Sequence, residues 1–96
     1  HWDWATIKPN AREKASFLKE NILPLQESGH LKLIENLSPF ENIEIIQVDG
    51  HTEKMMLPLI SYKNTKILYC ADLIPSSAHI PIPYVMGYDM RPLQTI

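Results

Sequence analysis

The sequence lacks features that mark several classes of protein. It has a single cysteine, Cys70, so no disulfide can form within the chain, which favours a reducing, cytoplasmic location. No apolar run approaches the roughly 20 residues that cross a bilayer. Nine lysine and arginine residues stand against eleven acidic ones, and no basic cluster is present that would neutralise phosphates. We therefore expect no membrane and no nucleic acid as partners.

The composition is that of a small globular domain. Of the 96 residues, 45% are hydrophobic and 21% are charged, with a net charge of −2. A chain of this length has room for one small core. It opens on His1 without an initiator methionine, and it closes soon after Asp89, an expected N-cap followed by Pro92, where a helix has hardly begun. We expect residues 1–96 to be a single fragment of a larger protein.

The first regular element that the sequence predicts is a helix. Asn10 is suited to the N-cap, and Glu13 completes a capping box three residues later. Pro24 is expected to kink or end the helix, and Gly29 to stop any continuation. Apolar residues recur at helical spacing along one face, at Ala11, Ala15, Leu18, Ile22 and Leu25.

Three apolar runs that follow predict strands: IEIIQV (43–48), MMLPLISY (55–62) and TKILYCA (65–71). The last two flank a short polar turn and predict a β-hairpin. Pro58 removes one ladder hydrogen bond, so it is expected at an edge or a bulge. Neither run of the hairpin alternates cleanly, which predicts strands covered on both faces in a layered α/β arrangement. Cys70 is expected to be a buried small hydrophobe rather than a reactive thiol.

The hairpin brings two candidate ligands together. If Lys63 and Asn64 form a two-residue turn, Met55 lies opposite Asp72, and His51 lies in the connection at the same end of the hairpin. An imidazole and a carboxylate that converge at strand ends are a common way to hold a cation such as zinc. The alternative is that His51 is a turn residue and that Asp72 caps the next loop.

These residues also carry a resemblance to a known family. The stretch VDGHTEKMMLPLISYKNTKILYCADLIPSSAHI resembles the second half of a metallo-β-lactamase-fold hydrolase, with GHT at 50–52 and AD at 71–72. The stretch HWDWATIKPNAREKASFLKENILPL is similar to the helical region that precedes it in some members, and YDMRPLQT to the approach to the next helix. The resemblance implies that residues 1–96 are the C-terminal part of such a domain. The fold implied is α/β: a partial αββα sandwich with one N-terminal helix and a β-hairpin packed in a mostly antiparallel sheet.

The resemblance implies that His51 ligates one metal, and that Asp72 bridges two metals and takes part in catalysis. The implied cofactor is zinc or another divalent metal, in a two-metal site that is incomplete here. The sequence departs from the family in having no His-x-His-x-Asp-His motif, in ending before the final ligand histidine, and in carrying Glu53 and Lys54 after the GHT turn. Only His51 and Asp72 are therefore carried over as ligands.

The function implied is that of a metal-dependent hydrolase, which uses a metal-bound hydroxide on a small-molecule ester, lactone, amide or phosphoester. The 96 residues alone are expected to be inactive, and to need the missing N-terminal half of the domain or a homo-oligomer partner. The alternative is a non-catalytic α/β protein-interaction module in which His51 and Asp72 are structural. His79, Tyr84 and Tyr88 are weaker candidates for a substrate pocket, and surface exposure or ordinary packing explains them equally well.

Overall fold

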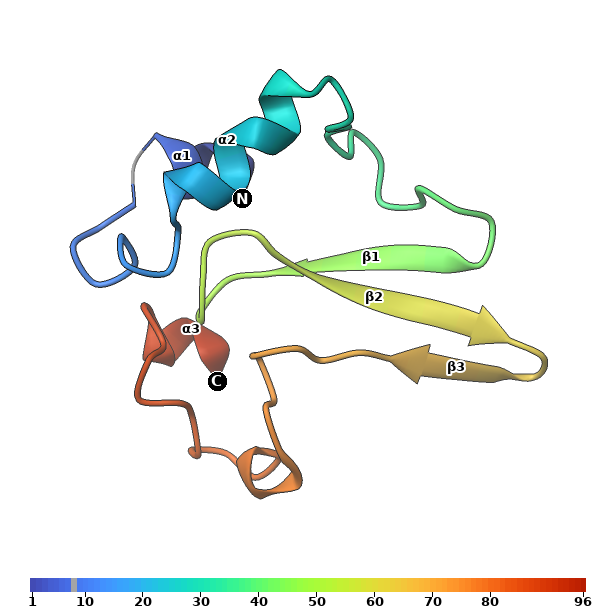
Figure 1. Cartoon of the computed structure of the whole chain (residues 1–96). Helices are drawn as coiled ribbons and strands as arrows, with labels where there is room; N and C mark the ends of the chain where they lie inside the picture. Colours follow the sequence, from blue (N-terminus) through green and yellow to red (C-terminus); the bar gives the residue numbers. More distant parts are fainter. Residues whose placement is uncertain (8) are drawn as a thin grey trace. The chain divides into compact units, whose positions relative to one another are not determined.

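The computed structural model describes residues 1–7 and 9–96, which form two compact units, 1–34 and 35–96 (Figure 1). The elements of the first unit are helical, whereas the second unit holds a sheet and two short helical turns. The chain is therefore of mixed α/β class, as expected. Among the described residues, no helix has the length and apolar character that a bilayer crossing requires.

The first unit contains two helices, α1 (Trp2–Thr6) and α2 (Lys19–Glu27), where one was expected. The Asn10 side-chain oxygen accepts the backbone N–H groups of Arg12 and Glu13 at 2.8 and 3.1 Å, as a capping side chain does, but no helix follows it. The chain then makes turns over 11–17 instead of a continuous helix. Leu18 takes an extended conformation, with φ −73° and ψ 114°, which breaks the helical path. The prediction of a helix starting at Asn10 was therefore wrong.

Pro24, which was expected to kink or end the helix, lies inside α2 and does not end it. Its ring nitrogen has no hydrogen to donate to the carbonyl of Glu20, so this helix of nine residues lacks one backbone hydrogen bond. The helix ends at Glu27, and Gly29 follows with φ +72°. A glycine in the left-handed region just beyond a helix is a common stop, so this part of the prediction is confirmed.

The second unit is built on a three-stranded antiparallel sheet in the order β1 (Ile43–Val48), β2 (Met55–Tyr62) and β3 (Thr65–Leu68) (Figure 1). In the β1–β2 ladder, Val48 lies opposite Met55. In the β2–β3 ladder, Tyr62 lies opposite Thr65, which leaves Lys63 and Asn64 as the two-residue turn. Lys63 has φ +51°, as this kind of hairpin turn requires. The predicted hairpin and its register are confirmed.

Pro58 lies in the central strand β2, opposite Ile45, and not at an edge or bulge as expected. Its carbonyl accepts the N–H of Tyr69 at 3.0 Å. Because the N and the C=O of a strand residue face the same neighbour, the donor that Pro58 lacks is missing on the β3 side. The β3 strand ends at Leu68, just before Tyr69, and is shorter than the predicted run 65–71.

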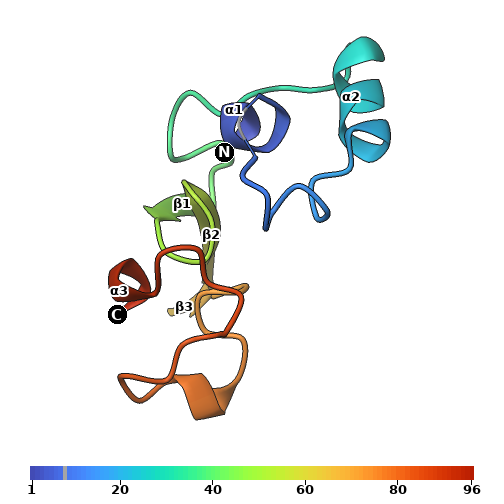
Figure 2. The ribbon, with the colours of Figure 1, turned by 90° about the vertical axis from the view of Figure 1, so that its left-hand side faces the viewer.

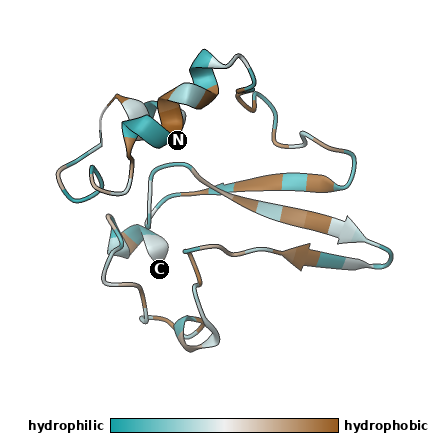
Figure 3. Cartoon of the chain, viewed as in Figure 1, coloured by the Kyte–Doolittle hydropathy of each residue, from teal (hydrophilic) through white to brown (hydrophobic). Residues whose placement is uncertain are grey.

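The buried residues of the sheet lie on both of its faces. Met55 and Leu57 share one face, and Leu57 is only 1% exposed, whereas Ile45 lies opposite Pro58 and is buried on the other face. Every residue of β3 is exposed, with Ile67 at 50% and Leu68 at 42% exposure. Apolar colour runs along β1, β2 and the end of β3 in Figure 3. The expectation of strands covered on both faces was wrong for β3, because η1 (Ser77–His79) and α3 (Pro92–Thr95) are single turns and every residue of β3 is exposed.

Replacing Leu57 by alanine should lower the free energy of unfolding by about 2–5 kcal/mol, because a buried side chain is lost and a cavity remains. Leu93 is 89% exposed, so Leu93→Ala is the matched control and should change that free energy by less than about 0.5 kcal/mol. Urea denaturation measures both variants. Equal effects at the two positions would show that Leu57 does not centre the core.

Candidate functional site

The candidate site lies where the β1–β2 connection meets the C-terminal segment. The connection turns sharply through Gly50 and Lys54, which have φ +135° and +54°. The backbone N–H of Arg91 donates to the Gly50 carbonyl at 2.8 Å, and that of Met90 to the His51 carbonyl at 3.3 Å. Figure 2 shows the segment that leads into α3 beside this connection. The sheet therefore positions His51 at one end of the hairpin, against residues that are distant in the sequence.

One ring nitrogen of His51 is bonded to a buried carboxylate. The Nδ1 atom lies 3.0 Å from Oδ1 of Asp89, a residue that is only 3% exposed. The hydroxyl of Thr95 donates to the other carboxylate oxygen at 2.6 Å. Asp89 is not the helix N-cap that the sequence predicts, since Arg91 holds that position in front of α3. Its carboxylate is committed to His51 and Thr95 instead.

The other ring nitrogen faces Asp72. Nε2 of His51 lies 3.5 Å from Oδ2 of Asp72, whose side chain is 62% exposed. The ladder has already ended before Asp72, so the predicted pairing with Met55 is not formed. A turn over 70–73 brings the carboxylate round instead, with Leu73 N–H donating to the Cys70 carbonyl and Ala71 at φ +45°. The expectation that His51 and Asp72 lie together is confirmed, although the path of the chain differs.

The chemistry of the two contacts is set by what a carboxylate can accept. An ionised Asp89 accepts only, so Nδ1 of His51 carries the hydrogen, and a neutral ring then presents a lone pair on Nε2. That lone pair faces an oxygen of Asp72 at 3.5 Å, which is too long for a hydrogen bond. A second proton on the ring, or a cation shared by the two atoms, makes this arrangement favourable.

The separation of the two atoms suits a shared metal ion. Nitrogen and oxygen ligands lie about 2.0–2.2 Å from zinc, so two ligands of one tetrahedral zinc are about 3.4 Å apart. The observed 3.5 Å agrees with that value. Asp89 contacts the opposite ring nitrogen, so it orients the ring and does not add a ligand. Among the described residues, no group of three or more histidine, cysteine or acidic side chains is placed to hold a metal. His51 and Asp72 are therefore only two candidate ligands among the described residues, against the four or so that zinc prefers.

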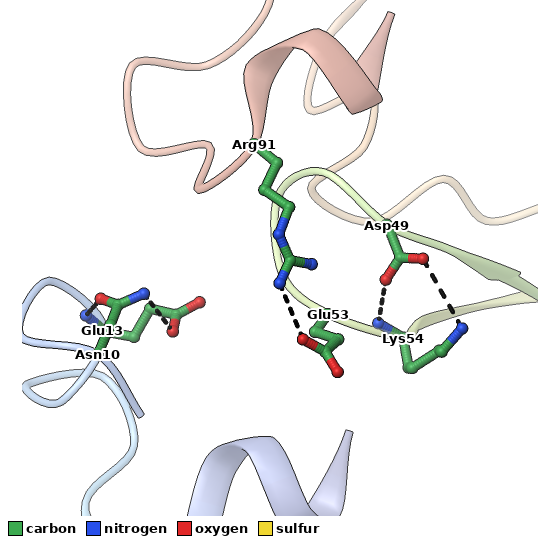
Figure 4. A network of polar contacts seen from close by, with 6 residues as sticks. All are labelled: Asn10, Glu13, Asp49, Glu53, Lys54 and Arg91. Atoms are coloured by element: carbon green, nitrogen blue, oxygen red, sulfur yellow. Dashed lines mark hydrogen bonds and ion pairs between the residues drawn. The ribbon is translucent and has the colours of Figure 1, made fainter. Parts of the chain in front are cut away.

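The charged side chains beside His51 are paired with one another (Figure 4). Arg91 donates to Glu53 at 2.9 Å, which adds a side-chain link between the C-terminal segment and the connection. The backbone N–H of Lys54 donates to Asp49 at 2.9 Å, and this bond lowers the pKa of the Asp49 carboxyl from its ordinary value. A lowered pKa means that the bond contributes stability above the ordinary pKa of an aspartate, and that the contribution is lost as the pH falls through the lowered value.

The other sequence candidates make no described polar contact with His51 or Asp72. His79 shares a hydrogen bond of 2.9 Å with the hydroxyl of Ser76. Tyr84 and Tyr88 are 63% and 77% exposed. Cys70 is half-buried, whereas the sequence predicts a buried residue. A cavity of about 480 Å³ belongs to the first unit and is lined by Ile7, Pro9, Lys14, Phe17, Leu18, Lys19 and Glu20.

Sequence reasoning missed the part that Asp89 and Thr95 play in the site. The sequence predicts Asp89 as a helix N-cap, which is not the contact with His51 that the structure shows. Gly50 was recognised only as a turn residue. A Cβ atom there would overlap the Thr95 hydroxyl and would stand 2.9 Å from the Thr95 Cα and N atoms. Contacts of this kind depend on how distant segments pack, which no local pattern reveals.

Comparison with protein-family models, curated proteins and solved structures found no match to this chain.

Replacing Gly50 by alanine should displace Thr95 and disturb the pair of Asp89 and His51. Strain at φ +135° alone costs about 1–3 kcal/mol of unfolding free energy, and the overlap with Thr95 adds to it. Gly29→Ala is a matched control, because Gly29 has φ +72° but no atom within 4 Å of the added Cβ. Urea denaturation should show the larger loss for Gly50→Ala. Equal losses would contradict the close packing of Thr95 on Gly50.

Proposed function

We propose that this chain is part of a metallo-β-lactamase-like, metal-dependent hydrolase, to which it contributes His51 and Asp72 as metal ligands. The observation that carries the proposal is the 3.5 Å separation of His51 Nε2 and Asp72 Oδ2. The GHT and AD motifs that resemble the family supply these same two residues. Two independent lines of reasoning, one from the resemblance and one from the geometry, therefore lead to the same pair.

The two ligands differ in their surroundings in a way that suits this role. The His51 side chain is 17% exposed and is tied from behind by Asp89, so its position is fixed. The Asp72 side chain is 62% exposed, so its carboxylate stays accessible to a substrate and to a water molecule. A divalent metal held there would activate that water and polarise the carbonyl or phosphoryl oxygen of an ester, lactone, amide or phosphoester. Asp72 would orient the attacking water.

The remaining ligands have to come from outside the described residues. Two protein ligands are half of what a zinc site normally uses. In our proposal the missing N-terminal half of the domain, or a second copy of the chain, supplies the others, and the 96 residues alone do not turn over substrate. The complete protein should hydrolyse at least one of these substrate classes, and a chelator should abolish that activity.

The direct test is zinc uptake by the purified chain. The wild-type chain should bind zinc, and His51→Ala and Asp72→Ala should each weaken binding by at least about 10–100-fold, the loss typical of removing even an outer partner. His30→Ala is the matched control, because the His30 residue is exposed and lies in the other unit. Elemental mass spectrometry after equilibrium dialysis measures the metal. Equal zinc content in wild-type and His51→Ala protein would defeat the proposal.

A second candidate function is that of a protein-interaction module. The observation that favours it is the open edge of the sheet, where Ile67, Leu68 and Tyr69 are 50%, 42% and 64% exposed. An exposed apolar edge strand presents unpaired backbone groups and readily adds a strand from another chain. In this reading His51 and Asp72 only stabilise the loops that they join.

Edge pairing predicts that the chain self-associates through β3. Ile67→Lys should then shift the chain toward monomer, because a charge on an edge strand opposes pairing. Leu93→Lys is the matched control, since Leu93 is 89% exposed and lies outside the sheet. Sedimentation velocity at increasing concentration measures the assembly state. A wild-type chain that stays monomeric at the highest concentration would rule out this mode of association.

A further inference from the structure

We infer that Asp89 is a positioning residue that holds the His51 ring in one tautomer, with Nδ1 protonated and Nε2 directed at Asp72, and that Thr95 and Gly50 hold Asp89 in place. The inference deepens the proposed function and rests on it, since the choice of tautomer matters most to a histidine that binds a metal. Neither the family resemblance nor the capping pattern assigns such a role to Asp89.

The first step is the burial of the carboxylate. The Asp89 side chain is 1% exposed, so water cannot satisfy its two oxygens. A buried carboxylate is tolerated only when hydrogen-bond donors surround it. Oδ1 has the ring nitrogen of His51 at 3.0 Å, and Oδ2 has the hydroxyl of Thr95 at 2.6 Å. Both neighbours must therefore donate.

The second step is the consequence for the ring. If Nδ1 lacked its hydrogen, two lone pairs would oppose each other at 3.0 Å in a buried place. The neutral ring therefore keeps its hydrogen on Nδ1, which leaves Nε2 free to bind a cation.

The third step is what fixes the second donor. The Thr95 backbone N–H donates to the Arg91 carbonyl at 3.3 Å, and Arg91 N–H donates to the Gly50 carbonyl at 2.8 Å. The Thr95 backbone comes so close to Gly50 that a side chain there would stand 2.9 Å from it. The missing side chain of Gly50 thus lets Thr95 reach the carboxylate. A residue of the β1–β2 connection and a residue near the C-terminus together set the position of Asp89.

The experiment reads the tautomer directly, by ¹⁵N NMR of the histidine rings in the metal-free full chain, in mildly alkaline buffer where free imidazole is neutral. Wild-type His51 should show a protonated Nδ1 and an unprotonated Nε2. Asp89→Ala should lose this single tautomer, and its affinity for zinc should fall by about 10–100-fold. Asp49→Ala removes a nearby carboxylate that does not touch His51, so it should change neither measurement.

A second pair of variants keeps the test decisive if Asp89→Ala does not fold. Thr95→Val removes the hydroxyl at nearly constant shape and should reduce the Nδ1-protonated fraction, whereas Thr95→Ser keeps the donor and should restore it. A wild-type ring protonated on Nε2, or a tautomer unchanged in both Asp89→Ala and Thr95→Val, would overturn the inference. Absence of zinc uptake by a wild-type chain with Nδ1 protonated would defeat the proposed function, yet it would support the role of Asp89.

Discussion

The carboxylate of Asp89 is the interaction on which the arrangement of the second unit depends. A buried charge is costly unless donors surround it, and its two donors come from different parts of the chain, His51 in the β1–β2 connection and Thr95 in α3. The backbone hydrogen bond from Arg91 to Gly50 and the ion pair between Arg91 and Glu53 join the same two segments of the chain. Together these contacts hold a loop and a C-terminal turn against one end of the sheet.

The same contacts give the His51 ring two unlike sides. On one side is a buried acid that accepts the ring hydrogen, and on the other is an exposed acid at 3.5 Å. A ring placed between two carboxylates has a defined direction, from the fixed side to the accessible side. A histidine that only fills a turn needs no such arrangement, and our proposal of a metal-binding function rests on this difference between the two sides of the ring.

The sequence predicted the sheet better than it predicted the helices. The register of the β2–β3 hairpin followed from the identity of the turn residues, because a two-residue turn leaves only one pairing. The proximity of His51 and Asp72 followed from that register. The break at Leu18 was not predictable, because nothing in the residue type disfavours a helix there. The central position of Pro58 was not predictable either, because it depends on β1 pairing with the other edge of β2.

The partners of Asp89 were hidden for a different reason. An aspartate shortly before a proline, as Asp89 is before Pro92, is commonly a helix N-cap. Only the packing of Gly50 against Thr95 shows that the Asp89 carboxylate contacts the distant His51 instead. Residues that lie near the ends of paired strands, such as His51 and Asp72, can be expected close together from the numbering of the hairpin. Residues that support those ligands from behind depend on three-dimensional contacts between loops, for which the sequence has no periodic signal.

Pro58 links the length of the hairpin to the chemistry at its far end. Because it offers no donor toward β3, the ladder stops at Leu68, and the residues up to Asp72 leave the plane of the sheet through the left-handed Ala71. A continuous strand would point successive side chains to opposite faces, and Asp72 would keep to the face that its number dictates. Pro58 in the middle of β2 thus ends β3 early. The direction of the Asp72 carboxylate, fourteen positions after Pro58, is set by the turn that follows β3 and not by the pleat of the sheet.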